Sequence, residues 1–283
     1  MEITNVCVIG SGIMGSGIAQ LCSTHGYVVN LVDVNIEILK TAKNAIERNL
    51  ERFFVLKNKI SKEEAENILN RINLSLNRDE AVYDTQIVIE AIFEDMNLKQ
   101  QLFSELDAIC SRDVILASNT SSLRITDLAL KSKIQERIVG IHFFNPAPVM
   151  KLIELIRGKK TSDEVLERSK SFSESLKKTV VSIKDSPGFV TSRLIYVLCN
   201  EAINMFREGI ASAEDIDIAC KLAFNFPMGP LELSDLVGND IYFHIGEYLE
   251  KMLGEKYRTS PLLKQMVKDG SLGRKSRKGF YNY

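Results

Sequence analysis

The sequence is poor in the residue types that mark several classes of protein. It has only three histidines, and its five cysteines form no C-x-x-C pair. It contains no apolar run of membrane-spanning length. Its 36 basic and 37 acidic residues give a formal net charge of −1. These absences argue against nucleic acid or a membrane surface as the main partner, and no metal site is predicted.

The cysteines are scattered, and several lie inside apolar segments. They are Cys7, Cys22, Cys110, Cys199 and Cys220. This pattern predicts buried free thiols in a reducing compartment, so we expect a cytoplasmic protein. The first apolar segment begins within a few residues of Met1, and we therefore expect no signal or transit peptide.

A glycine-rich turn follows that first apolar segment. In "VCVIGSGIMGSGIAQ" the residues Gly10, Gly12 and Gly15 fit G-x-G-x-x-G, with Ile13 and Met14 between them. The first glycine permits a tight turn, the second leaves room for a pyrophosphate, and the third lets helix and strand pack closely. The start of the helix then directs unpaired N–H groups at the phosphates.

A second apolar strand, residues 28–32, ends in Asp33. This acid lies 18 residues after Gly15, close to the spacing of about 20 expected for a ribose-binding carboxylate. A carboxylate there accepts hydrogen bonds from the ribose diol and repels a 2′-phosphate. The segment therefore predicts a dinucleotide site that favours NAD over NADP.

Strands and helices alternate through the first two thirds of the chain. Further strands are expected at 72–76, 87–91, 114–117, 137–144, 149–156 and 179–183, with helices at 97–111, 125–130 and 163–176. From Asn35 to Arg71 we expect a long helix to about Leu56 and a second helix opened by Ser61, which fits a capping box with Glu64. This pattern predicts an α/β fold with a Rossmann-type doubly wound, mostly parallel sheet and a long helical arm.

The string "DSPGF" interrupts the alternation, and the pattern of the remaining chain is helical. Helices are expected at 190–208, 212–222, 231–253 and 260–269. We predict an NAD-binding domain over residues 1–185 and an all-α C-terminal domain over residues 186–283.

A nicotinamide enzyme that oxidises an alcohol needs a general base. His25 follows the first helix and is interpreted as structural, and His244 is assigned to core or surface. His142 lies at the carboxyl end of an apolar strand in "RIVGIHFFNP", where ligands of open α/β sheets bind. A lone histidine on an apolar strand is otherwise a satisfied core residue, but the dinucleotide fold favours His142 as the base.

Two further polar features fall on the same edge. Glu154 shares strand parity with Leu152 and Ile156, so its carboxylate should be partly buried and needs a partner such as His142. The alternative is a solvated glutamate on an edge strand. The string "ASNTSS", residues 117–122, can hydrogen-bond a carbonyl or an amide, or it can be a polar turn.

Seven strings spread over nearly the whole chain carry a resemblance. They include "GSGIMGSGIAQ", "ASNTSSL", "HFFNPAPVMKLIEL", "PMGPLEL" and "GRKSRKGFYNY". Together they resemble the 3-hydroxyacyl-CoA dehydrogenases, and the chain length is similar to that of the stand-alone short-chain form acting on 3-hydroxybutyryl-CoA. The resemblance implies a homodimer, NAD as cofactor and a coenzyme A thioester as substrate.

The resemblance also implies roles for single residues. His142 matches the family's catalytic base and Glu154 its orienting carboxylate, while Ser121 matches a serine that contacts substrate and cofactor. Residues that match the lining of the NAD site are Glu94, Lys99, Asn145 and Lys275. On the loosely aligned arm, Lys57 and Lys59 are candidates for the coenzyme A phosphates.

One position departs from the family pattern. The family commonly has Asn just after the "PGF" turn, where this chain has Ser192. Serine is shorter and has one hydroxyl where asparagine has an amide. Ser192 can reach the substrate through water, or Asn200 on the same helix can contribute. We expect this difference to affect the affinity for the substrate or the preferred length of its acyl chain.

Two other functions stay open at this point. One is another Rossmann β-hydroxyacid dehydrogenase, which would use a lysine as acid and base. The other is a non-catalytic NAD-binding structural protein of the same family.

Overall fold

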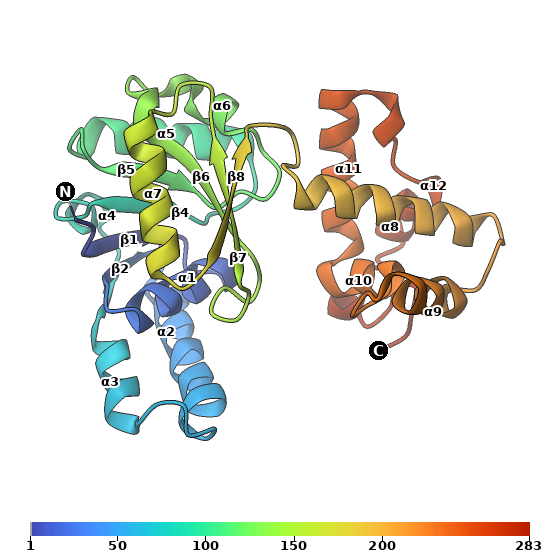
Figure 1. Ribbon diagram of the computed structural model, residues 1–283, viewed down its shortest axis with the longest axis horizontal. Coiled ribbons are helices and arrows are strands. Elements are labelled where there is room, and N and C mark those ends of the chain that lie inside the picture. The colour runs from blue at the N-terminus through green and yellow to red at the C-terminus, as the bar shows by residue number, and fades with distance from the viewer. Residues whose placement is uncertain (1) are drawn as a thin grey trace. The chain divides into compact units, whose positions relative to one another are not determined.

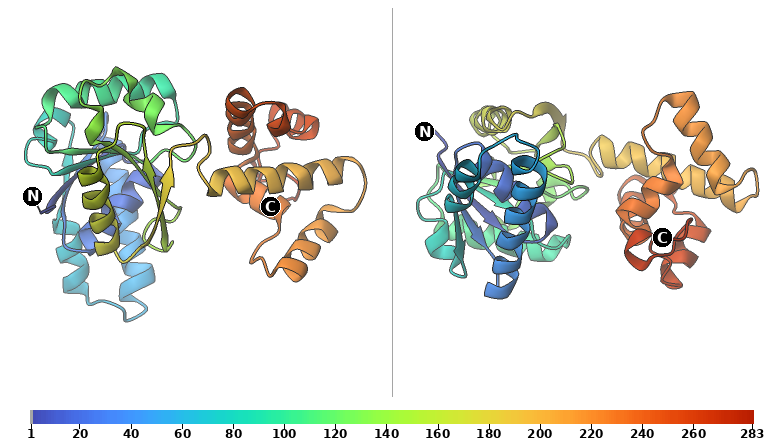
Figure 2. Two further views of the ribbon diagram at one scale, coloured as in Figure 1. Left: turned by 45° about the horizontal axis from the view of Figure 1, so that its top comes forward. Right: turned by 90° about the horizontal axis from the view of Figure 1, so that it is seen from below.

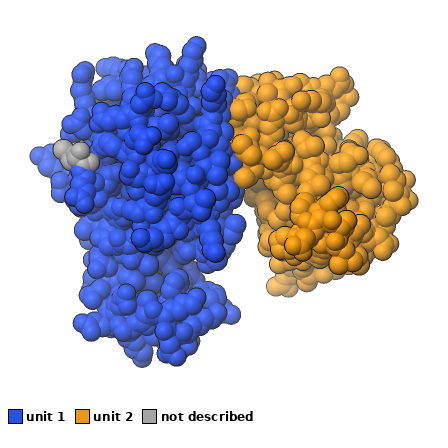
Figure 3. Space-filling view, viewed as in Figure 1, with its two compact units in different colours: residues 1–185 blue, residues 186–283 orange. Residues whose placement is uncertain are grey.

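The structure is a computed structural model that describes residues 2–283. The chain divides into two compact units, residues 1–185 and 186–283, coloured blue and orange in Figure 3. Each unit has its own hydrophobic core and is described by itself.

Unit 1 is built on one eight-stranded sheet. Its strands are β1 (Asn5–Ile9), β2 (Val28–Val32), β3 (Ile72–Ser75), β4 (Ile87–Glu90), β5 (Ile115–Ser118), β6 (Ile138–Phe143), β7 (Leu152–Arg157) and β8 (Thr179–Lys184). They lie in the order β3-β2-β1-β4-β5-β6-β7-β8. All neighbours pair in parallel except β6 and β7. The predicted doubly wound, mostly parallel sheet is confirmed.

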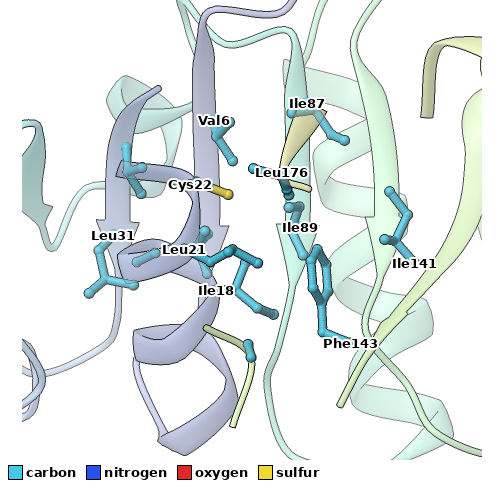
Figure 4. Close-up of a cluster of buried hydrophobic side chains, with 14 of the residues drawn as sticks. Val6, Ile18, Leu21, Cys22, Leu31, Ile87, Ile89, Ile141, Phe143 and Leu176 are labelled. Atoms are coloured by element: carbon cyan, nitrogen blue, oxygen red, sulfur yellow. The ribbon is translucent and has the colours of Figure 1, made fainter. Parts of the chain in front are cut away.

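Helices cover both faces of this sheet (Figure 1). They are α1 (Ile13–Thr24), α2 (Ile36–Leu50), α3 (Lys62–Asn70), α4 (Arg78–Ala81), α5 (Met96–Ile109), α6 (Ile125–Leu128) and α7 (Asp163–Ser175), with short turns η1 (Glu51–Val55), η2 (Ala129–Lys131) and η3 (Gln135–Arg137). Helices α1, α2, α3 and α7 share one apolar core with the strands. Figure 4 shows Ile18, Leu21 and Leu176 against strand residues such as Ile89 and Ile141. Helices α5 and α6 lie on the other face, where α6 places Ile125 over Gly140 of β6.

Helices α2 and α3 pack against each other and project beyond the sheet as the expected arm (Figures 1 and 2). The side chain of Asn35 caps α2, and Ser61 Oγ accepts the Glu64 N–H (3.0 Å), as the capping box predicts. The long helix ends differently from the expectation, because α2 stops at Leu50 and residues 51–55 form the π-helical turn η1.

Unit 2 is entirely helical. Its elements are α8 (Thr191–Arg207), α9 (Ala213–Phe224), α10 (Pro230–Val237), α11 (Asn239–Leu253), η4 (Glu255–Tyr257), α12 (Pro261–Lys268) and η5 (Arg274–Ser276). Buried residues of α8, among them Tyr196 and Cys199, form its core with α9, α10, α11 and α12. The single helix expected at 231–253 is wrong. Gly238 adopts φ 116°, a conformation that side chains disfavour, and separates α10 from α11.

Candidate active site

Four polar side chains line up near the carboxyl ends of β4, β5 and β6. Side chains alternate along a strand, and on these strands the apolar core takes Ile89, Ala117 and Ile141. The opposite face therefore receives Glu90, Ser118 and His142, and Glu154 of β7 joins them. The register places Glu90 opposite Ser118 and His142 opposite Glu154, and Ser118 lies opposite Gly140, two residues before His142.

His142 and Glu154 form a buried pair on neighbouring antiparallel strands. Their Nδ1 and Oε2 atoms lie 2.8 Å apart, and the residues are 6% and 1% exposed. The alternative of a solvated edge-strand glutamate does not hold, because β8 pairs with β7 on its other side. The ring of Phe144 packs on the imidazole, with ring centroids 4.3 Å apart.

The pairing selects the tautomer of the histidine. An ionised carboxylate only accepts hydrogen bonds, so the Nδ1 atom of His142 carries the hydrogen that Glu154 receives. In the neutral ring the lone pair is then on Nε2. Neutral His142 is thus arranged to take up a proton at Nε2, and the buried carboxylate offsets the positive charge that results.

A second buried pair is formed by residues of β4 and α5. Lys99 Nζ is 2.6 Å from Glu90 Oε1 and 3.0 Å from Glu94 Oε2, and Lys99 is 1% exposed. Burial raises the pKa of Glu90, and the charge and hydrogen bond of Lys99 offset this only in part. Burial alone lowers the pKa of Lys99, but the Glu90 and Glu94 carboxylates reverse the shift, and the net pKa is raised.

The loop after β5 is tied to both carboxylates. Ser118 Oγ donates to Glu90 Oε2 (2.6 Å) and accepts the Thr120 N–H (3.1 Å). Glu94 Oε1 accepts from the Thr120 hydroxyl (2.5 Å) and from the Ser121 N–H (3.2 Å). Ser121, Glu94 and Lys99, which the resemblance places around the cofactor, thus belong to one hydrogen-bonded network.

The glycine turn leaves space for a ligand at the start of α1. Gly10 has φ 96°, and a Cβ on Gly15 would lie 1.7 Å from the Gly10 carbonyl oxygen. A Cβ on Gly12 would meet nothing within 4 Å. Ile13 beside it is 76% exposed, while Met14 is half-buried and packs against the core. The first turn of α1 holds no acidic residue, so the helix N-terminus fits an anionic pyrophosphate.

Asp33 follows β2 directly and reaches back to this turn. Its Oδ2 accepts the backbone N–H and the hydroxyl of Ser11, both at 2.7 Å, and its Oδ1 accepts the Val34 N–H (2.7 Å). A carboxylate has about four lone-pair sites, so it retains acceptor capacity for a ribose hydroxyl. The turn and Asp33 together fit a dinucleotide.

The loop between β6 and β7 carries Asn145, which is exposed. Lys178 holds this loop, because its Nζ donates to the carbonyls of Ala147 (2.8 Å) and Met150 (2.7 Å). Sequence reasoning missed Lys178 and Glu90, and it gave Asn119 only as part of the polar string at residues 117–122. The Asn119 Oδ1 accepts the Phe143 N–H (2.9 Å) and so fixes the end of the strand that bears His142.

Three predicted residues lie in unit 2. Ser192 is buried near the start of α8. The Asn200 side chain accepts the Ser260 N–H (2.8 Å) and donates to the Arg258 carbonyl (3.1 Å). Lys275 pairs with the carboxylate of Asp240 at 2.5 Å.

The arm places the two candidate lysines above aromatic rings. Lys57 Nζ is 5.5 Å from the ring centroid of Phe53, and Lys59 Nζ is 5.6 Å from that of Phe54. Arg52 lies 5.2 Å from the same Phe53 ring. Both lysines are exposed, and Phe53 is 42% exposed.

The remaining histidines stand apart from this arrangement. His25 Nδ1 lies 2.9 Å from the Leu21 carbonyl oxygen in the last turn of α1, and His244 is exposed beside Glu247. Within residues 2–283, no group of three or more acidic, histidine or cysteine side chains could hold a metal ion. In that same range no helix combines the length and apolarity needed to cross a membrane.

Comparison with known proteins agrees with this geometry. The profile of the 3-hydroxyacyl-CoA dehydrogenase NAD binding domain matches residues 5–186, and that of the C-terminal domain matches residues 188–283. A "Probable 3-hydroxybutyryl-CoA dehydrogenase" of Bacillus subtilis is 45% identical, covering 100% of this chain and 98% of its own. A "3-hydroxybutyryl-CoA dehydrogenase" of Clostridioides difficile is 41% identical over 98% of this chain and 99% of its own.

A solved structure shows the same likeness. The (S)-3-hydroxybutyryl-CoA dehydrogenase PaaH1 of Ralstonia eutropha superimposes with a TM-score of 0.95 at 40% identity, covering 100% of this chain and 99% of that one. The fold and site define an NAD-dependent oxidoreductase. The chain belongs to the 3-hydroxyacyl-CoA dehydrogenase family, as its motifs predicted.

Proposed function

We propose that the protein interconverts L-3-hydroxybutyryl-CoA and acetoacetyl-CoA, with NAD as the redox partner. The observation that carries the proposal is the buried His142–Glu154 pair at the carboxyl edge of a sheet whose first turn fits a dinucleotide. The names of the relatives support the short-chain thioester as substrate.

In this proposal His142 is the general base and acid. In the oxidation, Nε2 of His142 takes the proton of the 3-hydroxyl group, and Glu154 offsets the charge that develops on the ring. When bound, NAD supplies the hydride acceptor, and its reduced form supplies the hydride donor for the reverse reaction. In the reduction, protonated His142 returns its proton to the 3-oxo oxygen. Positioned proton transfer of this kind contributes about 10²–10⁴-fold to the rate.

The other predicted residues hold the two reactants. Ser121 is proposed to contact substrate and cofactor, with Asp33 on the ribose. The other residues proposed to line the cofactor site are Glu94, Lys99, Asn145 and Lys275. Ser192 is proposed to contact the acyl group. Asn200 stays a candidate, although both ends of its amide already bind backbone groups.

The arm is proposed to bind the coenzyme A phosphates through Lys57 and Lys59. A groove of about 700 Å³ lies between α2 and α3, and its lining includes Arg48, Arg52 and Phe53. The lining also holds Glu47, Glu51 and Glu66 and includes neither of the two lysines, so support for the proposal comes from the exposed cations Arg52, Lys57 and Lys59 beside the Phe53 and Phe54 rings.

Unit 2 is proposed to form a homodimer and to contribute to the substrate cleft. Apolar side chains on α8 and α9 face outward from this unit, including Leu194 (68% exposed), Ile218 (51%), Leu222 (81%) and Phe224 (61%). Large exposed apolar side chains gathered on two helices are typical of an interface. Sedimentation of wild type and Leu222→Asp tests this, with a monomeric variant expected.

A cytoplasmic location is proposed from the thiols. Four of the five free cysteines are buried, and burial raises the pKa of Cys199 to about 12 and that of Cys110 to about 11. Such thiols are unreactive because they are buried, and free cysteines in place of disulfides are typical of a reducing compartment.

The function is tested by consumption of NADH with acetoacetyl-CoA, free acetoacetate and a longer 3-oxoacyl-CoA. Turnover with acetoacetyl-CoA and none with free acetoacetate supports the proposal, and the longer substrate reports on Ser192. Binding of NADH without turnover of any thioester would refute it and favour a non-catalytic NAD-binding protein. Turnover of free acetoacetate with none of the thioesters would favour a different dehydrogenase class.

A further inference from the structure

Two buried carboxylates of unit 2, Asp217 and Asp235, have no place in the chemistry proposed above. They are 2% and 1% exposed. Among residues 2–283, no lysine or arginine forms an ion pair with either of them. A buried carboxylate without a cation is stabilised mainly by the hydrogen bonds that it accepts. The donors of these hydrogen bonds therefore indicate what the two aspartates hold in place.

Both aspartates accept hydrogen bonds from residues 281–283. Asp235 Oδ2 accepts the Tyr281 N–H (2.9 Å) and the Tyr283 hydroxyl (3.3 Å). Asp217 Oδ2 accepts the Tyr281 hydroxyl (2.7 Å). Asp217 also accepts two N–H groups of the first turn of α10, each at 2.8 Å, and Asp235 lies on α10 itself. The two aspartates thus fasten this segment to α10.

A short loop, residues 273–283, is folded tightly around Asp235. A Cβ on Gly273 would clash with the Asp235 carbonyl oxygen, and a Cβ on Gly279 would clash with the Asp235 carboxylate. Both positions therefore need a residue without a side chain. Lys275, proposed above to line the cofactor site, lies between the two glycines in η5.

Asp235 also fixes the side-chain partner of Lys275. The Oδ1 atom of Asp235 accepts from the amide of Asn239 (3.0 Å), which is fully buried and donates as well to the Ser271 carbonyl (3.0 Å). Asn239 begins α11, and the next residue is Asp240, whose carboxylate binds Lys275 Nζ at 2.5 Å. One buried carboxylate thus holds both the backbone around Lys275 and the group that orients its ammonium.

Resting on the proposed function, in which Lys275 contacts the cofactor, we infer that Asp235 and Asp217 are positioning residues for NAD binding and act through Lys275. A lysine ammonium on its flexible stem loses conformational freedom when it binds a ligand, and a support that is fixed in advance lowers this cost. The pair of Lys275 with Asp240 is 44% and 27% exposed, and such pairs hold their partners weakly. The buried anchors of the loop therefore provide the rigid support.

The test removes the hydroxyl groups that the loop donates to the two aspartates. In Tyr281→Phe/Tyr283→Phe both rings stay, and each carboxylate keeps its N–H donors. The matched control is Tyr196→Phe. Tyr196 is 1% exposed in the core of the same unit, and its hydroxyl is bonded to the Tyr257 carbonyl (2.8 Å) and to Thr259 (3.0 Å). The control thus removes a buried hydroxyl group and leaves the hydrogen bonds of the loop in place.

The experiment measures the Kd of NADH by fluorescence, kcat with acetoacetyl-CoA at saturating NADH, and the Tm of each variant. In Tyr281→Phe/Tyr283→Phe we expect the Kd of NADH to rise about 2- to 10-fold, which corresponds to the cost of ordering one side chain on binding. The kcat of this variant should stay within about twofold of wild type, since only binding is affected. In Tyr196→Phe the Tm should fall and the Kd of NADH should not change.

A double-mutant cycle tests whether the effect passes through Lys275. Lys275→Met should weaken NADH binding at least about tenfold, because a hydrogen bond from a charged group is lost. In the Lys275→Met background, the two tyrosine substitutions should not raise the Kd of NADH further, because the group that they position is gone.

Four results would overturn the inference. An unchanged Kd of NADH with a lowered Tm in Tyr281→Phe/Tyr283→Phe would give the loop a purely structural role. An equal rise of the Kd in Tyr196→Phe would show that any loosening of unit 2 weakens binding. A further rise in the Lys275→Met background would show that the aspartates act by another route. An unchanged Kd in Lys275→Met itself would remove Lys275 from the cofactor site.

Failure of the proposed function gives a different result. The Kd of NADH is measured without turnover, so the inference is tested on binding alone. A wild-type protein that binds NADH and reduces no thioester would refute the proposed reaction, whatever the tyrosine variants show.

Discussion

The Glu154→Gln variant tests the proposed chemistry at its centre. Glutamine keeps the shape of the side chain, and its carbonyl oxygen can still accept the hydrogen of His142 Nδ1. The substitution removes the negative charge 2.8 Å from the ring. We therefore expect NADH and thioester binding to persist, and kcat to fall in both directions of the reaction.

The size of the effect follows from the burial of the pair. At 6% and 1% exposure, solvent screens the interaction little. A hydrogen bond to a charged group contributes about 1.5–3 kcal/mol and the neutral one that glutamine keeps about 0.5–1.5 kcal/mol, so the loss is about 1–1.5 kcal/mol. Since about 1.36 kcal/mol corresponds to a tenfold change in rate, kcat should fall by about 5- to 15-fold. Removing the imidazole in His142→Ala should have the larger effect of about 10²–10⁴-fold.

The assay compares initial rates with acetoacetyl-CoA and NADH, and with L-3-hydroxybutyryl-CoA and NAD, at saturating concentrations. Asp107→Asn is the matched control, because it neutralises another buried carboxylate of unit 1, at the amino end of β6. Retention of kcat within about twofold in Glu154→Gln would refute the reasoning. An equal loss of kcat in Asp107→Asn would also refute the reasoning, because neutralising any buried carboxylate would then lower kcat.

Three further outcomes are expected. Gly15→Ala should lower the Tm or prevent folding, because its Cβ would clash with the Gly10 carbonyl oxygen. Gly12→Ala should fold normally, because its Cβ meets no protein atom. In titrations it should bind NADH at least about tenfold more weakly, because that Cβ occupies the space for the pyrophosphate. In Lys99→Met the Glu90 carboxyl, whose pKa burial raises in wild type, loses its cation. A folded-state pKa above the unfolded value means that the folded protein binds more protons, so stability is lost as pH rises. The Tm deficit against wild type should grow from about pH 5 to pH 8 and disappear when Glu90→Gln is added. Lys178→Met should raise the KM for NADH with little change in Tm, because Lys178 fixes the loop of Asn145 from outside the core; an unchanged KM would contradict that.

Local patterns in the sequence were enough to predict most of unit 1. The glycine turn, the apolar strands and the Ser61 cap each depend on neighbouring residues, and each is present in the structure. The antiparallel direction of β7 was not predicted, because an apolar strand has the same pattern in either direction. The break at Gly238 was also missed, since an isolated glycine within a helical pattern does not reveal its φ.

In the candidate site, too, local sequence patterns predicted some features and not others. Strand parity predicted a buried Glu154, and the structure gives it His142 as partner. Glu90 had the same signal, a carboxylate that ends the apolar strand "IVIE", but parity alone does not say which cation lies opposite. That cation is nine residues away on α5, and only the packing of α5 on the sheet shows that its ammonium is buried.

The two buried carboxylates, Glu90 and Glu154, bind different cationic partners, and this difference agrees with the role proposed for His142. Glu90 faces a lysine whose raised pKa keeps its ammonium group charged at neutral pH, and this pair is hydrogen-bonded to the loop that bears Ser121. Glu154 faces a histidine, which gains and loses a proton in each proposed reaction cycle. A lysine in place of His142 would make both pairs permanent, so His142→Lys should retain the fold while losing turnover. If His142→Lys turned over near the wild-type rate, the proton carrier would have to be another residue.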